Sequence, residues 1–205
     1  MINLFNIDCM KFMKDKSDNF YELAIVDPPY GAVNKMVPSG GTSALKNKMG
    51  KWDHPPEKKY FVELFRISKY QIIWGGNYFT DKIPISSRWV VWQKTGGLKN
   101  FPQFEMAWTN TNIPNKIFTM SRADSHINER ITCHPTEKPI KLYKWLLKNY
   151  AKPGDKILDT HGGSMSIAIA CADMGFDLDL CELDKDYFKA GKKRYEKHIS
   201  QIRMF

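Results

Sequence analysis

The last quarter of the chain constrains the fold most, because strand and helix patterns alternate there. Residues 156–158 and 176–181 are short apolar runs typical of strands, and residues 165–174 and 184–198 carry apolar side chains at helical spacing. Strands joined through helices run parallel, and a parallel sheet needs helices on both of its faces. The pattern predicts an α/β protein, a three-layer α/β/α sandwich with a mostly parallel sheet.

The same two patterns continue through the rest of the chain. Its 205 residues are enough for one domain with a single hydrophobic core, and no internal repeat divides them. We therefore expect one domain over residues 1–205. The sequence predicts further strands at 2–7, 22–26, 70–74, 88–92, 104–109 and 116–120, and helices at 55–68 and 139–150.

Charge and composition narrow the class of partner. The net charge of +9 favours a polyanion such as nucleic acid, since each cation near a phosphate releases a condensed counterion. The longest apolar runs, 23–26 and 167–171, are too short to span a bilayer, and the first residues lack the pattern of a signal peptide. We expect a cytoplasmic protein without a membrane partner. The four cysteines form no C-x-x-C pair, so no metal site is predicted.

A glycine turn and an acid mark the late strand–helix unit. Gly162 and Gly163 lie where one strand passes into a helix, and Glu182 ends the following strand. Such glycines allow close approach of a ligand, and an acid at the neighbouring strand end accepts both ribose hydroxyls of an adenosine-containing cofactor. The alternative is that the glycines only close the turn. No G-x-x-x-x-G-K-[ST] motif is present, which disfavours a phosphate cradle.

The tetrapeptide Asp27-Pro28-Pro29-Tyr30 follows the predicted buried strand 22–26. Ligand chemistry in open α/β sheets takes place at the carboxyl ends of strands, which is where this tetrapeptide falls. At average residue frequencies, a given tetrapeptide arises by chance in a chain of this length about once in a thousand. The competing interpretation is a proline-rich turn that simply ends the strand.

These four residues suit chemistry on the amino group of a nucleobase. An aryl amine is a poor nucleophile, because its lone pair is delocalised into the ring. The Asp27 carboxylate and the Pro28 carbonyl would accept both amino hydrogens and favour a localised lone pair. Pro28 and Pro29 restrict the backbone that holds these acceptors. Tyr30 offers a flat face on which an extruded base would stack.

Four motifs and Glu182 together resemble the amino-methyltransferases of nucleic acids. Their order resembles the circularly permuted β-class, in which D-P-P-Y precedes the glycine motif. The segments 72–79 and 89–94 look like core segments of the same family. The motifs are N-I-D-C at 6–9, D-P-P-Y at 27–30, H-P-T-E-K-P at 134–139 and D-T-H-G-G-S at 159–164.

The resemblance implies a Rossmann-like methyltransferase fold with S-adenosylmethionine as the cofactor. It implies a catalytic half over about 1–130 and a cofactor-binding half over about 131–205. In this family the acid of the first motif reaches the adenine edge of the cofactor, and the hexapeptide lies beside its methionine moiety. The implied catalytic residues are Asp27, Pro28, Pro29 and Tyr30. The implied cofactor contacts are Asp8, Cys9, Asp27, His134, Thr136, Lys138, Asp159, His161, Gly162, Gly163, Ser164, Glu182 and Leu183.

Two of these assigned residues would also have a local structural role, and the sequence departs from the family pattern in two respects. Asp8 and Thr136 would also serve as caps of the helices that follow them. Met165 stands where the family pattern has a glycine after the serine. We expect the family's separate target-recognition domain to be nearly absent, which leaves the lysine-rich loop 31–53 and the segment 94–131 to read DNA. We therefore expect a short recognised sequence, or the help of a second copy, as in a homodimer, or of a second subunit.

The resemblance implies methylation of the 6-amino group of an adenine flipped out of double-stranded DNA, as in restriction–modification systems. It places the protein in the cytoplasm of a prokaryotic cell, or of the host of a phage that encodes it. Cytosine 4-amino methyltransferases are the nearest alternative, but within the family they usually have serine in place of Asp27. A non-catalytic nucleic-acid-binding subunit is a second alternative. Its active-site residues would be expected to degenerate, whereas Asp27, Tyr30 and Glu182 are intact.

Overall fold

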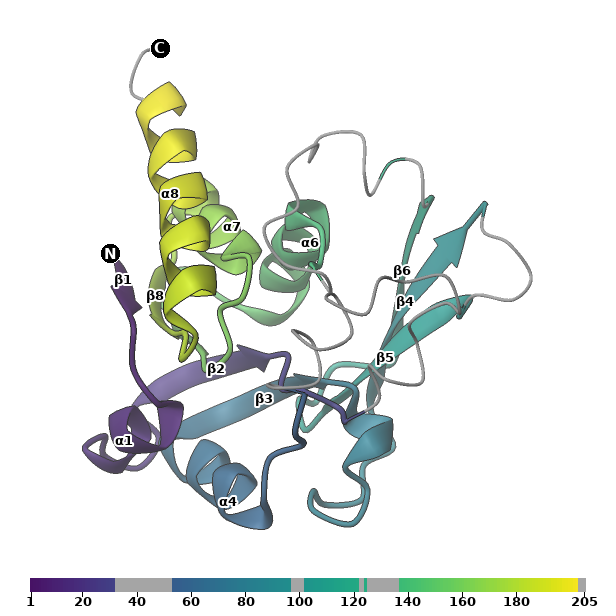
Figure 1. The fold of residues 1–205 in the computed structure, drawn as a ribbon. Coiled ribbons are helices and arrows are strands. Elements are labelled where there is room, and N and C mark those ends of the chain that lie inside the picture. The colour runs from purple at the N-terminus through teal and green to yellow at the C-terminus, as the bar shows by residue number, and fades with distance from the viewer. Residues whose placement is uncertain (32–52, 97–101, 122–123, 125–136, 203–205) are drawn as a thin grey trace, which may run out of the picture.

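The computed structural model describes residues 1–31, 53–96, 102–121, 124 and 137–202. These residues form one eight-stranded sheet with helices packed against it (Figure 1). The strands are β1 Ile2–Phe5, β2 Tyr21–Val26, β3 Ser68–Trp74, β4 Trp89–Thr95, β5 Phe104–Thr109, β6 Lys116–Ser121, β7 Lys156–Asp159 and β8 Asp177–Cys181. The helices are α1 Cys9–Lys14, α4 Lys58–Ile67, the 3-10 helix η1 Gly76–Tyr78, α6 Ile140–Tyr150, α7 Ser166–Met174 and α8 Lys185–Ile202.

The strand order is β1-β8-β7-β2-β3-β5-β4-β6. Strands β1, β8, β7, β2 and β3 pair parallel to one another in this order, and β4 pairs parallel to β6. Strand β5 runs antiparallel to both β3 and β4. The sheet is therefore mixed but mostly parallel, as the alternation of strand and helix patterns predicts.

Helices cover both faces of the sheet, which confirms the three-layer prediction (Figure 1). Leu23 and Ile25 of β2 belong to the core cluster that includes α6 and α7, with α8 packed beside it. Ala24 and Val26 belong to the opposite cluster with α1 and α4. This alternation follows from the two-residue period of a strand. Among the described residues, no helix combines the length and apolarity that a bilayer crossing needs.

The position of helix α4 follows from the spacing of its apolar side chains. Its buried side chains Tyr60, Phe61, Leu64 and Ile67 recur at three- and four-residue spacing. The predicted helix over 55–68 begins later, at Lys58, because the two prolines before it remain outside the helix. Its last residue, Ile67, is followed directly by Ser68, the first residue of β3.

Met165 precedes the first residue of α7, at the position where the family pattern has a glycine. Its backbone has a φ of 58°, in the left-handed region that a glycine adopts without strain. Its side chain is fully buried against α8. A Cβ added at Gly191 of α8 would lie 2.8 Å from Met165 Cγ and 3.0 Å from the Gly163 carbonyl oxygen. The missing side chain at Gly191 therefore makes room for the methionine beside the glycine turn.

Candidate active site

The carboxyl ends of four parallel strands meet at one edge of the sheet. In the pairing register, Ala24 of β2 lies beside Leu158 of β7, and Phe5 of β1 lies beside Cys181 of β8. The residues that follow these positions are the motifs singled out in the sequence. The fold thus gathers Asp27, the turn 159–164, Glu182 and the Asp8 segment along a single edge, where open α/β sheets bind ligands.

Asp27 is held by two hydrogen-bond donors. The Tyr30 hydroxyl donates to its Oδ1, and Lys138 Nζ lies 2.5 Å from its Oδ2. Lys138 precedes α6 and is buried, with 4% of its surface exposed. The D-P-P-Y tetrapeptide and the hexapeptide are far apart in sequence, yet they meet at this carboxylate.

Two more charged residues, from strands β4 and β5, extend this contact. Glu105 Oε2 lies 3.5 Å from Lys138 Nζ, and its Oε1 accepts from Lys94 Nζ. Burial acts to lower the pKa of Lys138, but the Asp27 and Glu105 carboxylates outweigh it and raise the pKa. Burial acts to raise the pKa of Glu105, but Lys138 and Lys94 outweigh it and lower the pKa. Both groups are therefore charged at neutral pH.

Glu105 was not among the residues predicted from the sequence. Its signal is weak, because it is one acid in the six-residue strand F-E-M-A-W-T, and an acid at an alternating position reads as solvent-facing. Its partner Lys94 is likewise a single lysine at the end of a strand. Only the packing of β5 beside β3, towards Lys138, reveals their proximity to Asp27.

The Tyr30 ring is fixed by close packing. A Cβ added at Gly75, where φ is +66°, would lie 2.2 Å from Tyr30 Cε1, so only a glycine allows the backbone to approach this ring. Tyr78 of η1 stacks on Tyr30, with ring centroids 5.1 Å apart and planes at 11°. Burial, with a further contribution from the Asp27 charge, raises the pKa of Tyr30, so its hydroxyl remains a donor.

Glu182 and the glycine turn form the second part of the site. Glu182 Oε2 accepts from the Gly163 N–H and its Oε1 from the Asp184 N–H, both at 2.8 Å. A Cβ at Gly162 would lie 2.2 Å from Leu180 Cδ2, so this glycine lets the turn pack tightly against β8. Burial raises the pKa of Glu182. Glu182 and the glycine turn are therefore in direct contact.

Asp159 and His161 lie in the same turn, where Asp159 is buried and His161 is half-buried. Asp159 Oδ1 accepts from the His161 N–H at 2.9 Å, and burial raises the pKa of Asp159 to about 8. Burial lowers the pKa of His161 to about 4, so its ring is neutral at physiological pH. The Thr160 hydroxyl, between them in sequence, lies 2.6 Å from the hydroxyl of Tyr60 on α4.

The Asp8 segment lies beside Glu182. Asn6 Nδ2 donates to the backbone carbonyls of Glu182 and Leu183, at 2.8 and 3.1 Å. Asp8 Oδ1 accepts from the Met10 N–H at 2.8 Å, which confirms the capping role considered for it. Cys9 is the first residue of α1, and burial, with a smaller effect of Asp8, raises the pKa of its thiol to about 12. The Leu183 side chain is exposed.

Some predicted residues lie outside the described part of the chain. They include His134 and Thr136 of the hexapeptide and residues 32–52 of the lysine-rich loop. In the described ranges, no three metal-ligating side chains come together. Ser164 is described and buried, with its hydroxyl 3.0 Å from that of Ser166.

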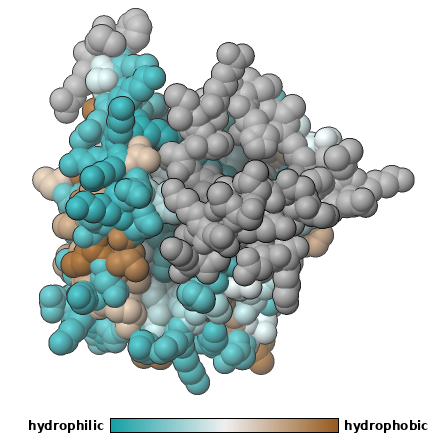
Figure 2. Space-filling view, in the orientation of Figure 1, coloured by the Kyte–Doolittle hydropathy of each residue, from teal (hydrophilic) through white to brown (hydrophobic). Residues whose placement is uncertain are grey.

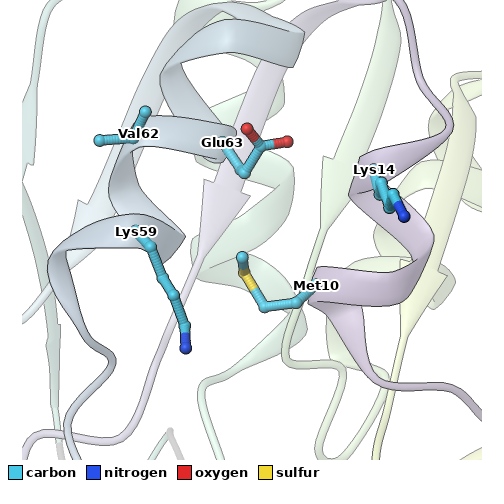
Figure 3. Close-up of a pocket in the computed structure, with 5 residues that line it drawn as sticks. All are labelled: Met10, Lys14, Lys59, Val62 and Glu63. Carbon is cyan, nitrogen blue, oxygen red and sulfur yellow. The ribbon is translucent and has the colours of Figure 1, made fainter.

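A separate hollow lies between α1 and α4, on one helical face of the sheet (Figure 3). Met10, Lys14, Lys59, Val62 and Glu63 line it, and none of them belongs to the predicted site. Figure 2 shows that the surface over α8 is mainly hydrophilic, in keeping with its row of lysines. Neither feature adds a residue to the edge that holds Asp27 and Glu182.

Comparison with known proteins decides the family. The family model described as DNA methylase matches residues 79–193, which is more than half of the chain. The chain belongs to the DNA methylase family. This methylase is 22% identical to the type II methyltransferase M.HpaI of Haemophilus parainfluenzae, over 94% of this chain and 74% of the relative. It is 26% identical to the DNA adenine methyltransferase YhdJ of Escherichia coli, over 48% of this chain and 32% of that protein.

Solved structures share the fold of this methylase. A crystal structure of an M1.HpyAVI–SAM complex superposes with a TM-score of 0.65 and 16% identity, covering 95% of this chain and all of that one. The cytosine-N4-specific PvuII DNA methyltransferase superposes with a TM-score of 0.63 and 13% identity, covering 97% of this chain and 90% of its own. These likenesses confirm the predicted Rossmann-like methyltransferase fold.

Proposed function

We propose that this DNA methylase transfers a methyl group from S-adenosylmethionine to the 6-amino group of adenine in double-stranded DNA. The observation that carries the proposal is the Asp27 carboxylate, fixed at the end of β2 by Tyr30 and Lys138. It lies on the same sheet edge as the glycine turn and Glu182. An acceptor for an amino group and a site for an adenosine cofactor are thus side by side.

The hydrogen-bond acceptors of Glu182 suit the ribose of the cofactor. The two oxygens of Glu182 each accept one backbone N–H, and each retains a lone pair for a ribose hydroxyl. We assign the adenine edge to Asp8 and Cys9, and the methionine moiety to the hexapeptide 134–139. Asp159, His161 and Ser164 belong to the turn that encloses the cofactor. The SAM complex of the similar M1.HpyAVI supports this choice of cofactor.

Methyl transfer here depends on positioning. When bound, S-adenosylmethionine would supply the methyl group to the amino nitrogen of the base and leave as the neutral thioether S-adenosylhomocysteine, while the methylated amine releases one proton to solvent. Asp27 and the Pro28 carbonyl accept the two amino hydrogens, so the nitrogen lone pair localises towards the methyl group. Pro28 and Pro29 hold these acceptors in place, and Tyr30 supplies a stacking face for the flipped base. No covalent enzyme intermediate is needed, because orientation and electrostatics lower the barrier.

Adenine is the favoured base because Asp27 occupies the position that the resemblance gives to serine in cytosine enzymes. The likeness to YhdJ, a DNA adenine methyltransferase, supports this choice. The neighbour from PvuII is cytosine-N4-specific, so cytosine is the alternative that the assay must separate. A single methyltransferase domain over residues 1–205 and a homodimer are parts of the same proposal.

Replacing Glu182 tests the cofactor assignment. Glu182→Ala should weaken binding of S-adenosylmethionine by roughly 1–3 kcal/mol, the usual effect of losing a charged hydrogen-bonding partner. Isothermal titration calorimetry measures this affinity. Glu196→Ala, which removes an exposed carboxylate of α8, is the matched control and should bind as the wild type does. Unchanged affinity in the folded Glu182→Ala variant would remove the ribose contact from the proposal.

A further inference from the structure

Four buried or half-buried charges of alternating sign run from β4 to the catalytic carboxylate. Lys94 Nζ donates to Glu105, Glu105 Oε2 lies 3.5 Å from Lys138 Nζ, and Lys138 Nζ lies 2.5 Å from Asp27 Oδ2. Lys94 and Glu105 lie on β4 and β5. Lys138 lies two residues before the start of α6, and Asp27 directly follows β2. Segments far apart in sequence thus converge on one ammonium group.

The ammonium of Lys138 is shared between two carboxylates. Its side chain is 3% exposed, its Nζ is 3.3 Å from the Tyr30 hydroxyl and 5.2 Å from the centre of the Trp74 ring. A buried cation needs a carboxylate partner, because removal of the partner leaves an uncompensated charge. Glu105 gives Lys138 a second carboxylate within ion-pair distance. Without Glu105, Asp27 would be the one carboxylate left beside Lys138 among the described residues.

We propose that Glu105 is a positioning residue of the methyl-transfer site. It draws part of the Lys138 hydrogen bonding away from Asp27, so that Asp27 remains available as an acceptor for the amino group of the target base. This inference rests on the proposed function. When the base amine donates to Asp27, Lys138 shifts towards Glu105, and the buried ammonium keeps an anionic partner throughout. Lys94 holds Glu105 in reach of this exchange.

The test compares Glu105→Gln with a matched control, Glu22→Gln. Glu22 is a half-buried strand carboxylate paired with Lys69 at 3.2 Å, with 33% side-chain exposure against 30% for Glu105. Glu22 lies near the start of β2, whereas Asp27 follows the end of that strand, five residues later. Steady-state methyl transfer, calorimetric binding of S-adenosylmethionine and thermal melts are measured on both variants of the full chain.

We expect Glu105→Gln to lower kcat by about tenfold or more, as misplacement of a catalytic group does. Its KM for DNA and its cofactor Kd should stay within about twofold of the wild type. Glu22→Gln should keep the wild-type kcat. Glu105→Asp, which retains the charge with a shorter reach, should recover part of the lost kcat. This split between kcat and binding is what a merely structural role would not produce.

Two results would overturn the inference while the proposed function stands. One is a wild-type kcat in Glu105→Gln, in an enzyme that methylates adenine. The other is a Glu105→Asp variant no more active than Glu105→Gln, because the negative charge would then not be the relevant property. This comparison remains valid even if Glu105→Gln has a lowered melting temperature. A wild-type protein that transfers no methyl group to DNA instead overturns the proposed function itself.

Discussion

Asp27→Ala should lower the rate of methyl transfer by about 10²- to 10³-fold, the effect of removing one preorganised hydrogen-bonding group at a reacting centre. Asp27 supplies the acceptor that localises the amino lone pair, and no other described carboxylate lies as close to Lys138. Single-turnover methylation with saturating cofactor and DNA measures the rate.

The same variant should fold and largely keep its cofactor affinity. The ammonium of Lys138 retains Glu105 as an anionic partner at 3.5 Å, so the substitution leaves no isolated buried charge. Thermal melts and calorimetry beside the rate measurement establish this. Normal melting and binding together with near wild-type turnover would show that Asp27 only ends a strand, as the proline-rich turn interpretation holds.

Tyr30→Ala should lose roughly 1–3 kcal/mol of base stacking, about a ten- to hundredfold drop in rate or DNA affinity. Tyr30→Phe should retain substantial activity, because it keeps the ring and removes only the hydroxyl that donates to Asp27. Rates and melting temperatures of both variants are compared with the wild type. Tyr78→Phe is a suitable control, since Tyr78 stacks on Tyr30 through its ring.

The two Tyr30 variants separate stacking from hydrogen bonding. In the structure the hydroxyl donates to Asp27 Oδ1, so its loss frees that oxygen for the base. If Tyr30→Phe is as inactive as Tyr30→Ala and melts normally, the hydroxyl is the essential group and the stacking account fails.

The elements of the sheet could be read from the sequence because their signals are local. Strand β5 spans the predicted residues 104–109, and β7 and α7 differ from the prediction by one residue at one end. Their apolar periods coincide with faces that the fold buries. The 3-10 helix η1 was missed, because a single turn of three residues has no period to detect.

The strand order and the charges around Asp27 depend on contacts distant in sequence. The motifs predicted that Asp27 and Lys138 share a site, but not that they form an ion pair. Glu105 reaches them only because β5 inserts antiparallel between β3 and β4. The position of Met165 likewise depends on Gly191, a glycine inside a helix whose use becomes clear only when α8 packs on the turn.

The identity of the methylated base shows whether the enzyme methylates adenine at its 6-amino group. The purified protein is incubated with double-stranded DNA and S-adenosylmethionine carrying a labelled methyl group. The DNA is then digested to nucleosides, which are separated and identified by mass spectrometry. We expect labelled N6-methyladenine in the wild-type reaction and its loss with Asp27→Ala. Label in N4-methylcytosine, or DNA without label, would contradict this expectation.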